Sequence, residues 1–228
     1  KLNGVELTRE GGLMVAETPS QMDFLRQKAE RETKKGLSVD VLEPDDVLKI
    51  APYLGPDIVG AEICHNEGKL NPLVANRKLE AHLVELGVTR IRDRISRIDT
   101  TDVPTAIGTD PYPADKIILA AAWGTGNLIE GLGPSIPTPP EPLHMNITEP
   151  GDYRITQLVQ HAERPITLKQ FRSGQVLIGG GWAARAGSDD NVPSVLQDSL
   201  FRNVALAARI APGVAALRIM RTWAGYNT

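Results

Sequence analysis

The glycine-rich stretch QVLIGGGWAARAG at residues 175–187 constrains the fold most, because it resembles a phosphate-binding turn. Gly179, Gly181 and Ala184 match the spacing G-x-G-x-x-A. Such a turn binds phosphate only where it opens a helix. Here the polar run 185–191 would break a helix at once, and Asp198, the nearest acidic residue at the required distance, lies in a helical pattern. The stretch therefore predicts a strand that ends in a turn of small residues, where another backbone or a ligand comes close.

Composition narrows the class of protein. The chain has 228 residues, enough to bury a core, and a net charge of −3, which argues against a nucleic-acid or anionic-membrane surface. The single cysteine, Cys64, excludes an intrachain disulfide framework and favours a reducing, cytoplasmic location. We find no apolar run long enough for a membrane span, no secretory signal pattern and no metal-ligand spacing.

Both ends of the chain are unusual. It starts at Lys1 without a methionine and stops directly after the apolar segment 223–226. We expect it to be a piece of a longer protein.

The N-terminal part carries clear helix and strand signals. Gly12–Ala16 is typical of a strand, and Thr18, Pro19 and Gln21 predict a helix that begins with a capping box and ends at Gly36. Further expected elements are a short helix at Asp45–Ile50 and a strand at Ile58–Cys64.

The middle part of the chain, from Asn71 to Ala122, mixes apolar and charged positions. Asn71 and Pro72 predict a second helix start, with Gly87 as its end and an apolar side formed by Leu73, Leu79, Leu83 and Leu86. The expected elements that follow are a mixed segment with Ile91, Ile95 and Ile98 facing inward, a hairpin-like segment at Thr105–Pro113, and a strand at Lys116–Ala122 that is buried on both faces.

The C-terminal part begins with the proline-rich crossover Ile136–Pro142. We expect strands at Leu143–Thr148, Tyr153–His161 and Gln175–Gly181, a long helix at Val192–Ala211, and a last strand at Val214–Trp223. The buried side of that helix would consist of Val195, Leu196, Leu200, Val204, Ala207 and Ala208.

These patterns predict an α+β fold with two interleaved regions. Residues 1–67 and 138–228 would form one discontinuous domain with a mixed, largely antiparallel sheet flanked by helices. Residues 68–137 would form a smaller α/β region. From the residues alone, we claim a two-part globular fragment with a pocket of ligand size.

The order of segments resembles a known family. The segments are REGGLMVAET, IVGAEICHNEGKLNP, KIILAAAWGTGNL, IPTPP, SGQVLIGGGW and IMRTWAGYNT, and together they cover essentially the whole chain. This order is similar to that of the FAD-dependent D-amino-acid oxidase-like family, which includes glycine oxidase, sarcosine oxidase, D-amino-acid dehydrogenase, and subunits of opine oxidase and hydrogen cyanide synthase. GQVLIGGGW is most similar to the multi-subunit members.

The resemblance implies a substrate-binding domain plus the middle portion of an α/β FAD-binding domain, without the N-terminal Rossmann unit and the C-terminal segment. It implies FAD contacts near Ile95 and along Ala120, Ala121 and Trp123. LAAAW carries alanine, at Ala121 or Ala122, where the family usually has glycine, and an added methyl there would hinder close approach to FAD. Ile95 could equally be an ordinary core residue, and for Trp123 a core role fits better.

The resemblance also implies a substrate site. Trp182 would lie over the substrate, with Thr167, Gln170 and His65 as polar neighbours. Asn227 occupies the position at which glycine oxidase-like members have an arginine that binds the substrate carboxylate, and Thr167 stands where a tyrosine is frequent. Arg221 is the nearest alternative cation on the same strand, about 20 Å from Asn227 along it; His161 and Cys64 fit structural roles better.

The implied reaction is oxidation of the C–N bond of an amino acid or N-substituted amino acid, with hydride transfer to FAD. No catalytic acid or base is required of this chain, and the fragment alone is expected to be inactive. The alternative is a non-catalytic binding or assembly subunit of a multi-subunit amine dehydrogenase. Expected partners are therefore a small amino-acid-like substrate and further subunits.

Overall fold

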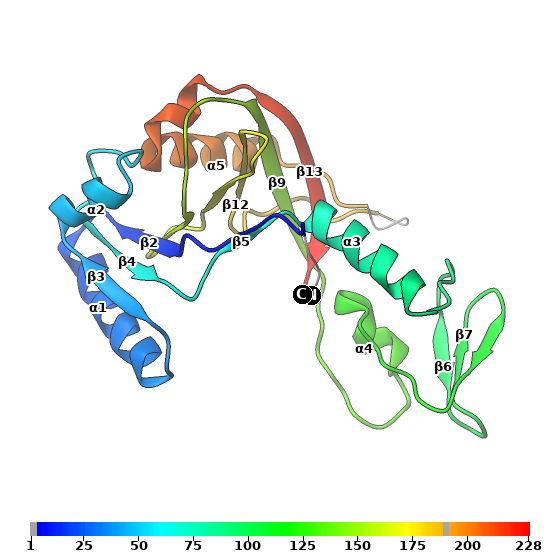
Figure 1. Ribbon diagram of the computed structural model, residues 1–228. Coiled ribbons are helices and arrows are strands. Elements are labelled where there is room, and N and C mark those ends of the chain that lie inside the picture. The colour runs from blue at the N-terminus through cyan, green and yellow to red at the C-terminus, as the bar shows by residue number, and fades with distance from the viewer. Residues whose placement is uncertain (1–3, 189–191) are drawn as a thin grey trace.

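The computed structural model describes residues 4–188 and 192–228, so the last part of the polar run at 185–191 lies outside the described residues. Its centre is an eight-stranded sheet in the order β13-β9-β12-β11-β10-β2-β4-β3 (Figure 1). Within this sheet only β10 and β2 pair in parallel, which confirms a mixed, largely antiparallel sheet. Its strands are β2 (Gly12–Ala16), β3 (Val39–Leu42), β4 (Gly60–Cys64), β9 (Glu141–Pro150), β10 (Leu158–His161), β11 (Thr167–Gln170), β12 (Gln175–Gly179) and β13 (Ile219–Asn227).

Helices cover the sheet unequally. Helix α5 (Gln197–Ile210) and the short α2 (Pro44–Ile50) pack on one face, where the main apolar core lies between them and side chains such as Val176 and Ile178. Helix α1 (Pro19–Lys34) packs on the opposite face, over β2, β3 and β4 only (Figure 1). The four strands β11, β12, β9 and β13 therefore keep that second face free of α1.

The predicted helix starts are confirmed. The Thr18 hydroxyl accepts a hydrogen bond from the Gln21 N–H at 3.3 Å, although the Gln21 side chain accepts from Glu17 N–H and not from the cap residue itself. The Asn71 side chain accepts from the Leu73 N–H at 3.2 Å and so caps α3 (Pro72–Glu85).

A smaller region lies between the two parts of the sheet in sequence. It contains α3, the three-stranded sheet β6-β7-β8, the 3₁₀ turn η1 and the short helix α4. The bounds are β6 Arg97–Asp99, β7 Thr105–Ile107, β8 Pro111–Pro113, η1 Ala122–Gly124 and α4 Thr125–Leu128; β1 (Leu7–Thr8) pairs with β5 (Lys69–Leu70) beside them. The hairpin expected at residues 105–113 is confirmed, and the division into two domains stays a prediction.

One strand prediction is wrong. Residues 116–121 form no helix or strand, and the Ile118 side chain is 92% exposed. An apolar run becomes a buried strand only beside other strands, because its backbone N–H and C=O groups need partners. No strand of the described chain pairs with this run.

Several other predicted buried residues and element bounds also differ from those in the structure. The α3 leucines Leu73, Leu79, Leu83 and Leu86 are exposed, because the described chain packs nothing over them, and Ile91 is exposed too. Helix α5 starts at Gln197, not Val192, and its buried residues are Asn203, Leu206, Ala207 and Ile210. The last strand begins only at Ile219, because Pro212–Ala216 forms the 3₁₀ turn η2. Strand β10 likewise begins at Leu158, not Tyr153.

The glycine stretch behaves as a strand end. Strand β12 stops at Gly179, and no helix begins at the turn that follows, so it is not a phosphate-binding turn. Gly180 has φ of +114°, and a Cβ there would lie 2.4 Å from the Ile166 Cα. Gly181 has φ of +85° but open space around it. Close approach of two backbones therefore requires glycine at position 180.

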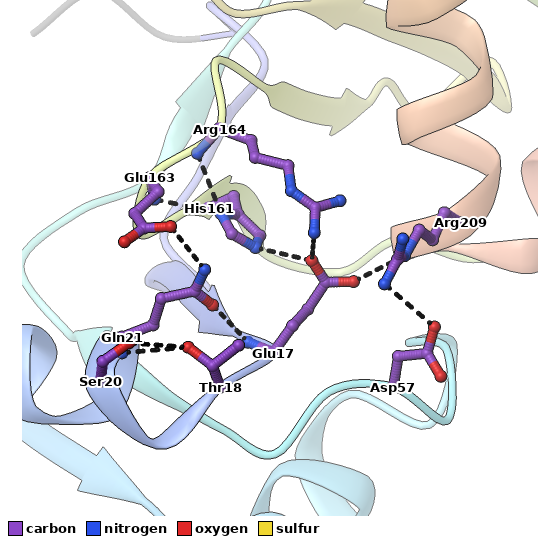
Figure 2. Close-up of polar contacts among 9 residues, drawn as sticks. All are labelled: Glu17, Thr18, Ser20, Gln21, Asp57, His161, Glu163, Arg164 and Arg209. Atoms are coloured by element: carbon purple, nitrogen blue, oxygen red, sulfur yellow. Dashed lines mark hydrogen bonds and ion pairs between the residues drawn. The ribbon is translucent and has the colours of Figure 1, made fainter.

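A buried carboxylate joins three parts of the fold (Figure 2). The Glu17 side chain, directly after β2, is 3% exposed and contacts His161 at 3.1 Å, Arg209 of α5 at 2.8 Å, and Arg164. The His161 Nδ1 accepts the backbone N–H groups of residues 163 and 164, so the ring proton is on Nε2 and points to Glu17. The structural role expected for His161 is confirmed.

The glycine turn gives a stability prediction. In the full-length protein, Gly180→Ala should lower the free energy of unfolding by about 3 kcal/mol, because it adds a backbone clash to left-handed strain. Gly181→Ala is the matched control and should cost about 1–2 kcal/mol, from strain alone. Urea unfolding measures both, and equal losses would contradict the assigned clash.

The His161 environment gives a pH prediction. Burial lowers the pKa of His161 below its ordinary value of 6.5, so the unfolded chain binds its proton first as the pH falls. This contribution to stability is complete above pH 6.5 and is lost as the pH falls below it. His161→Gln keeps a donor for Glu17 but cannot titrate. The difference in unfolding free energy between wild type and this variant should therefore shrink between pH 8 and pH 5, and a constant difference would contradict the assignment.

Candidate functional site

The uncovered face of the sheet presents two rows of side chains in register. One row runs Arg221, Ile147, Leu177 and Lys169 across β13, β9, β12 and β11. The next row runs Trp223, Met145, Gly179 and Thr167. A Cβ at Gly179 would lie 2.3 Å from the Met145 sulfur, so Met145 fills the space that this glycine leaves.

A pocket of about 460 Å³ lies on this face. The start of α3 forms its second wall, so residues distant in sequence meet there. Its lining is mostly apolar and consists of Asn71, Pro72, Leu73, Ile147, Phe171, Gln175, Leu177, Arg221 and Trp223. An apolar cavity with a few polar groups is the usual form of a small-molecule site.

Two cations on this face have no anionic partner. The Arg221 guanidinium carbon lies 6.0 Å from the centre of the Trp223 ring, and the Lys169 Nζ lies 5.8 Å from that of Phe171. Among the described residues, neither has a carboxylate within 4.0 Å. Burial lowers the pKa of Lys169. Both side chains are therefore available to an anion.

Two of the expected substrate residues lie on the same face. Thr167 is half-buried and stands beside Gly179 in the second row. Asn227 is exposed and pairs with Glu141 at the far end of β13, six residues beyond Arg221. Neither residue lines the pocket. Sequence alternation places them on the pocket side of the sheet, and their substrate contact stays a prediction.

The other three expected substrate residues point elsewhere. The Gln170 amide binds the backbone at Tyr153, Ile155 and Gly174, so its hydrogen-bonding groups are already used. The Trp182 ring packs with the core under α5, bonds the Pro165 carbonyl and lies 5.8 Å from the Arg202 guanidinium carbon.

His65 is distant as well. It is exposed, follows β4 and binds Asp40 at 2.8 Å near the opposite edge of the sheet.

A second cavity, of about 800 Å³, lies at the end of β13. Its wall includes Trp123, Tyr226, the proline-rich segment from residue 136 to 140, and the glycines Gly126, Gly131 and Gly133. The Trp123 and Tyr226 rings are 5.3 Å apart. Of the expected cofactor residues, Trp123 lines this cavity. Ala120 and Ala121 precede it in the chain and do not line the cavity, and Ile95 lies apart, next to Gly108.

Ala122 has an unusual backbone. Its φ is +48°, and Glu6 is the only other non-glycine residue of the described chain with positive φ. This left-handed conformation is disfavoured for alanine by about 1–2 kcal/mol and suits glycine. Of the two alanines that could stand at the family's glycine position, the backbone thus singles out Ala122.

Sequence reasoning missed Lys169 and treated Arg221 mainly as a structural residue. A signal for Lys169 existed, since it alternates with Thr167 and Phe171 and must share their face. That the face carries a pocket depends on α3, which no strand pattern reveals.

Comparison with known proteins supports this geometry. The chain is 23% identical to a subunit of opine oxidase from Rhizobium meliloti over 98% of its own length and 59% of that protein. It superimposes on glycine oxidase from Geobacillus kaustophilus with a TM-score of 0.85 and 16% identity, covering 98% of this chain and 60% of that one. For iminodiacetate oxidase from Chelativorans sp. BNC1, the TM-score is 0.80 and the identity 21%, covering 99% and 62%.

The chain thus spans about three fifths of the proteins that it matches. Among the described residues, no helix combines the length and apolar character needed to cross a bilayer. Residues 2–228 match the family described as FAD dependent oxidoreductase, whose cofactor is FAD, and the chain belongs to this family.

Proposed function

We propose that the protein from which this chain comes oxidises the C–N bond of an amino acid or N-substituted amino acid. One observation carries the proposal: Arg221 lines an apolar pocket and has no carboxylate partner among the described residues. A guanidinium binds a carboxylate through two parallel hydrogen bonds, which fixes the orientation of an amino acid. Arg221 would thus take over the task that Asn227, being uncharged, cannot perform.

The other pocket residues would orient the substrate and keep water out. Ile147, Leu177 and Trp223 offer apolar contact to the carbon skeleton, and Thr167 and Asn227 offer neutral hydrogen-bonding groups farther along the face. When bound, FAD supplies the acceptor for the hydride from the carbon that bears the amine. The protein's share is therefore position and electrostatics.

The residues of the second cavity fit an aromatic cofactor ring. Trp123 and Tyr226 give it an aromatic wall, and its lining also includes Gly126, Gly131 and Gly133. Ala122 keeps a glycine-like backbone beside it, at the cost of a strained φ. We propose Trp123 with the neighbouring Ala120 and Ala121 as part of the FAD contact, and Ile95 as a peripheral one.

The alternative function is a binding or assembly subunit without catalysis. The curated relative is named as one subunit of opine oxidase, and this name supports partner subunits. The proposed cytoplasmic location rests on the single buried free cysteine, Cys64. Flavin content separates the two functions, because only the oxidoreductase must bind FAD.

The first test is the visible absorbance spectrum of the full-length protein. We expect a flavin spectrum, release of FAD on denaturation, and bleaching by an amino acid or N-substituted amino acid under anaerobic conditions. Folded protein that neither carries nor takes up FAD would favour the assembly subunit.

Arg221 is tested by substitution. Arg221→Gln should raise KM for the substrate about 10- to 100-fold, with a smaller change in kcat, because it removes a charged hydrogen-bond partner of the carboxylate. Arg218→Gln is the control, since this exposed arginine precedes the same strand and does not line the pocket. Equal KM values for the two variants would exclude Arg221 as the carboxylate ligand.

Ala122 is tested by restoring glycine. Ala122→Gly should raise the unfolding free energy by about 0.5–1 kcal/mol, because it relieves the left-handed strain, and should tighten FAD binding. Ala186→Gly is the control, because Ala186 is exposed, lies outside the helices and strands and has no positive φ. Thermal unfolding and FAD titration of the full-length protein measure both effects; no gain over the control would contradict the assigned strain.

A further inference from the structure

A second buried carboxylate lies under helix α1. Glu62 stands in β4 between Met14 of β2 and Val41 of β3, and it is only 1% exposed. Met14 and Val41 pack against the apolar cluster that contains Met22 and Leu25 of α1. Glu62 therefore places an acidic group inside an otherwise apolar contact between helix and sheet.

One lysine serves two carboxylates at this contact. The Lys28 ammonium lies 2.5 Å from the Glu62 Oε2 and 2.8 Å from the Glu32 Oε1, and Lys28 and Glu32 are one turn apart on α1. The remaining oxygens, Glu62 Oε1 and Glu32 Oε2, are buried and have no hydrogen-bond partner in the described chain. With both acids ionised, the cluster of Lys28, Glu32 and Glu62 would keep an excess negative charge away from water, which is costly.

A proton between the two carboxyl groups removes this cost. Glu32 and Glu62 lie within hydrogen-bonding reach of each other. A carboxylate only accepts hydrogen bonds, so the two groups can bond to each other only if one of them is protonated. Burial raises the pKa of Glu62 to about 7. Burial acts on Glu32 too, but hydrogen bonds from Lys28 and Glu62 outweigh it and lower the pKa of Glu32. The proton therefore belongs on Glu62.

Other charged groups lie farther from Glu62. On α1, Arg31 favours the ionised form of Glu32. On the sheet, the neighbours of Glu62 across β2 and β3 are uncharged, and in the next row Cys64 ends β4 and the exposed Glu67 carboxylate lies against the start of β2. Helix α2 packs on the other face of β4, so its charged residues do not face Glu62.

We propose that Glu62 and Glu32 share one proton and that this proton, together with Lys28, fastens the C-terminal half of α1 to the sheet. When the proton leaves, an uncompensated negative charge stays buried under the helix, and α1 loosens. The cluster is thus a pH-sensitive contact between α1 and β4. It is independent of the proposed function, because none of its three residues lines either cavity described above.

The sign of the pH effect follows from the raised pKa of Glu62. The folded chain keeps this proton to a higher pH than the unfolded chain, in which a glutamate titrates near 4.5. The stabilising contribution is therefore complete below pH 4.5 and is lost as the pH rises through about 7. Glu62→Gln imitates the protonated form, because its amide N–H donates to Glu32 and its carbonyl accepts from Lys28.

Hydrogen exchange along α1 tests the inference. The readout is the protection factor of α1 peptides in the full-length protein, corrected for the intrinsic exchange rate. The ratio of this factor in Glu62→Gln to that in wild type should grow about 10-fold or more from pH 5 to pH 8. His161 is present in both proteins, so its titration cancels in the ratio. For Glu30→Gln, an exposed glutamate of the same helix, the ratio should stay constant. A ratio for Glu62→Gln that does not change with pH overturns the inference.

A second variant and a direct readout keep the test decisive if Glu62→Gln does not fold. In Glu32→Gln, the new amide donates to the Glu62 carboxylate, so the fall in α1 protection between pH 5 and pH 8 should shrink. Carboxyl-carbon NMR of wild type labelled at glutamate should show one signal that titrates near pH 7, and this signal should move to lower pH in Glu32→Gln. A wild type in which every glutamate titrates near its ordinary pKa overturns the shared proton.

Discussion

The buried Glu17 carboxylate links helix α5 to the junction between the two halves of the sheet. It stands between the end of β2 and the start of α1, and its oxygens bind His161 at the end of β10 and Arg209 on α5 (Figure 2). A carboxylate taken out of water is stable only with partners of opposite charge or hydrogen-bond donors. Glu17 therefore holds α5 against the sheet at the junction of its two halves. Val176 and Ile178 lie in the same apolar core as the buried residues of that helix.

The opposite face of the sheet is less covered by helices, and its cations are not paired with carboxylates. Helix α1 covers only three of its eight strands, and β11, β12, β9 and β13 present apolar side chains together with Lys169 and Arg221. Charges that serve stability alone are normally paired at such positions, as those around Glu17 are. Lys169 and Arg221 have no carboxylate partner among the described residues, and Arg221 lines the pocket. The same fold thus contains one cluster of charges that pair with one another and two cations that contact only aromatic rings.

Local signals in the sequence predicted much of the fold. Thr18 and Asn71 gave the helix starts, because a cap is a hydrogen bond within one turn of chain. The strand predicted at Lys116–Ala122 was wrong, because an apolar run forms a strand only where other strands of the protein pair with it. Of the residues predicted to be buried on α5, only Ala207 is, for a similar reason. Asn203 is buried because it bonds Asn146 of β9 and the Gly179 carbonyl, contacts that helical periodicity does not contain.

For the candidate site, too, some features follow from the sequence and others only from the tertiary structure. The sequence by itself determined the family, the strand alternation that puts Thr167 and Asn227 on one face, and the alanine that replaces a glycine near Trp123. Only the tertiary structure decided that Trp182 turns to the α5 side, that the strain falls on Ala122, and that Lys169 and Arg221 share a row with a pocket between them. The physical reason is the separation along the chain of the residues that interact. Capping and alternation act within a few residues, whereas register, helix coverage and charge pairing join residues far apart in the chain.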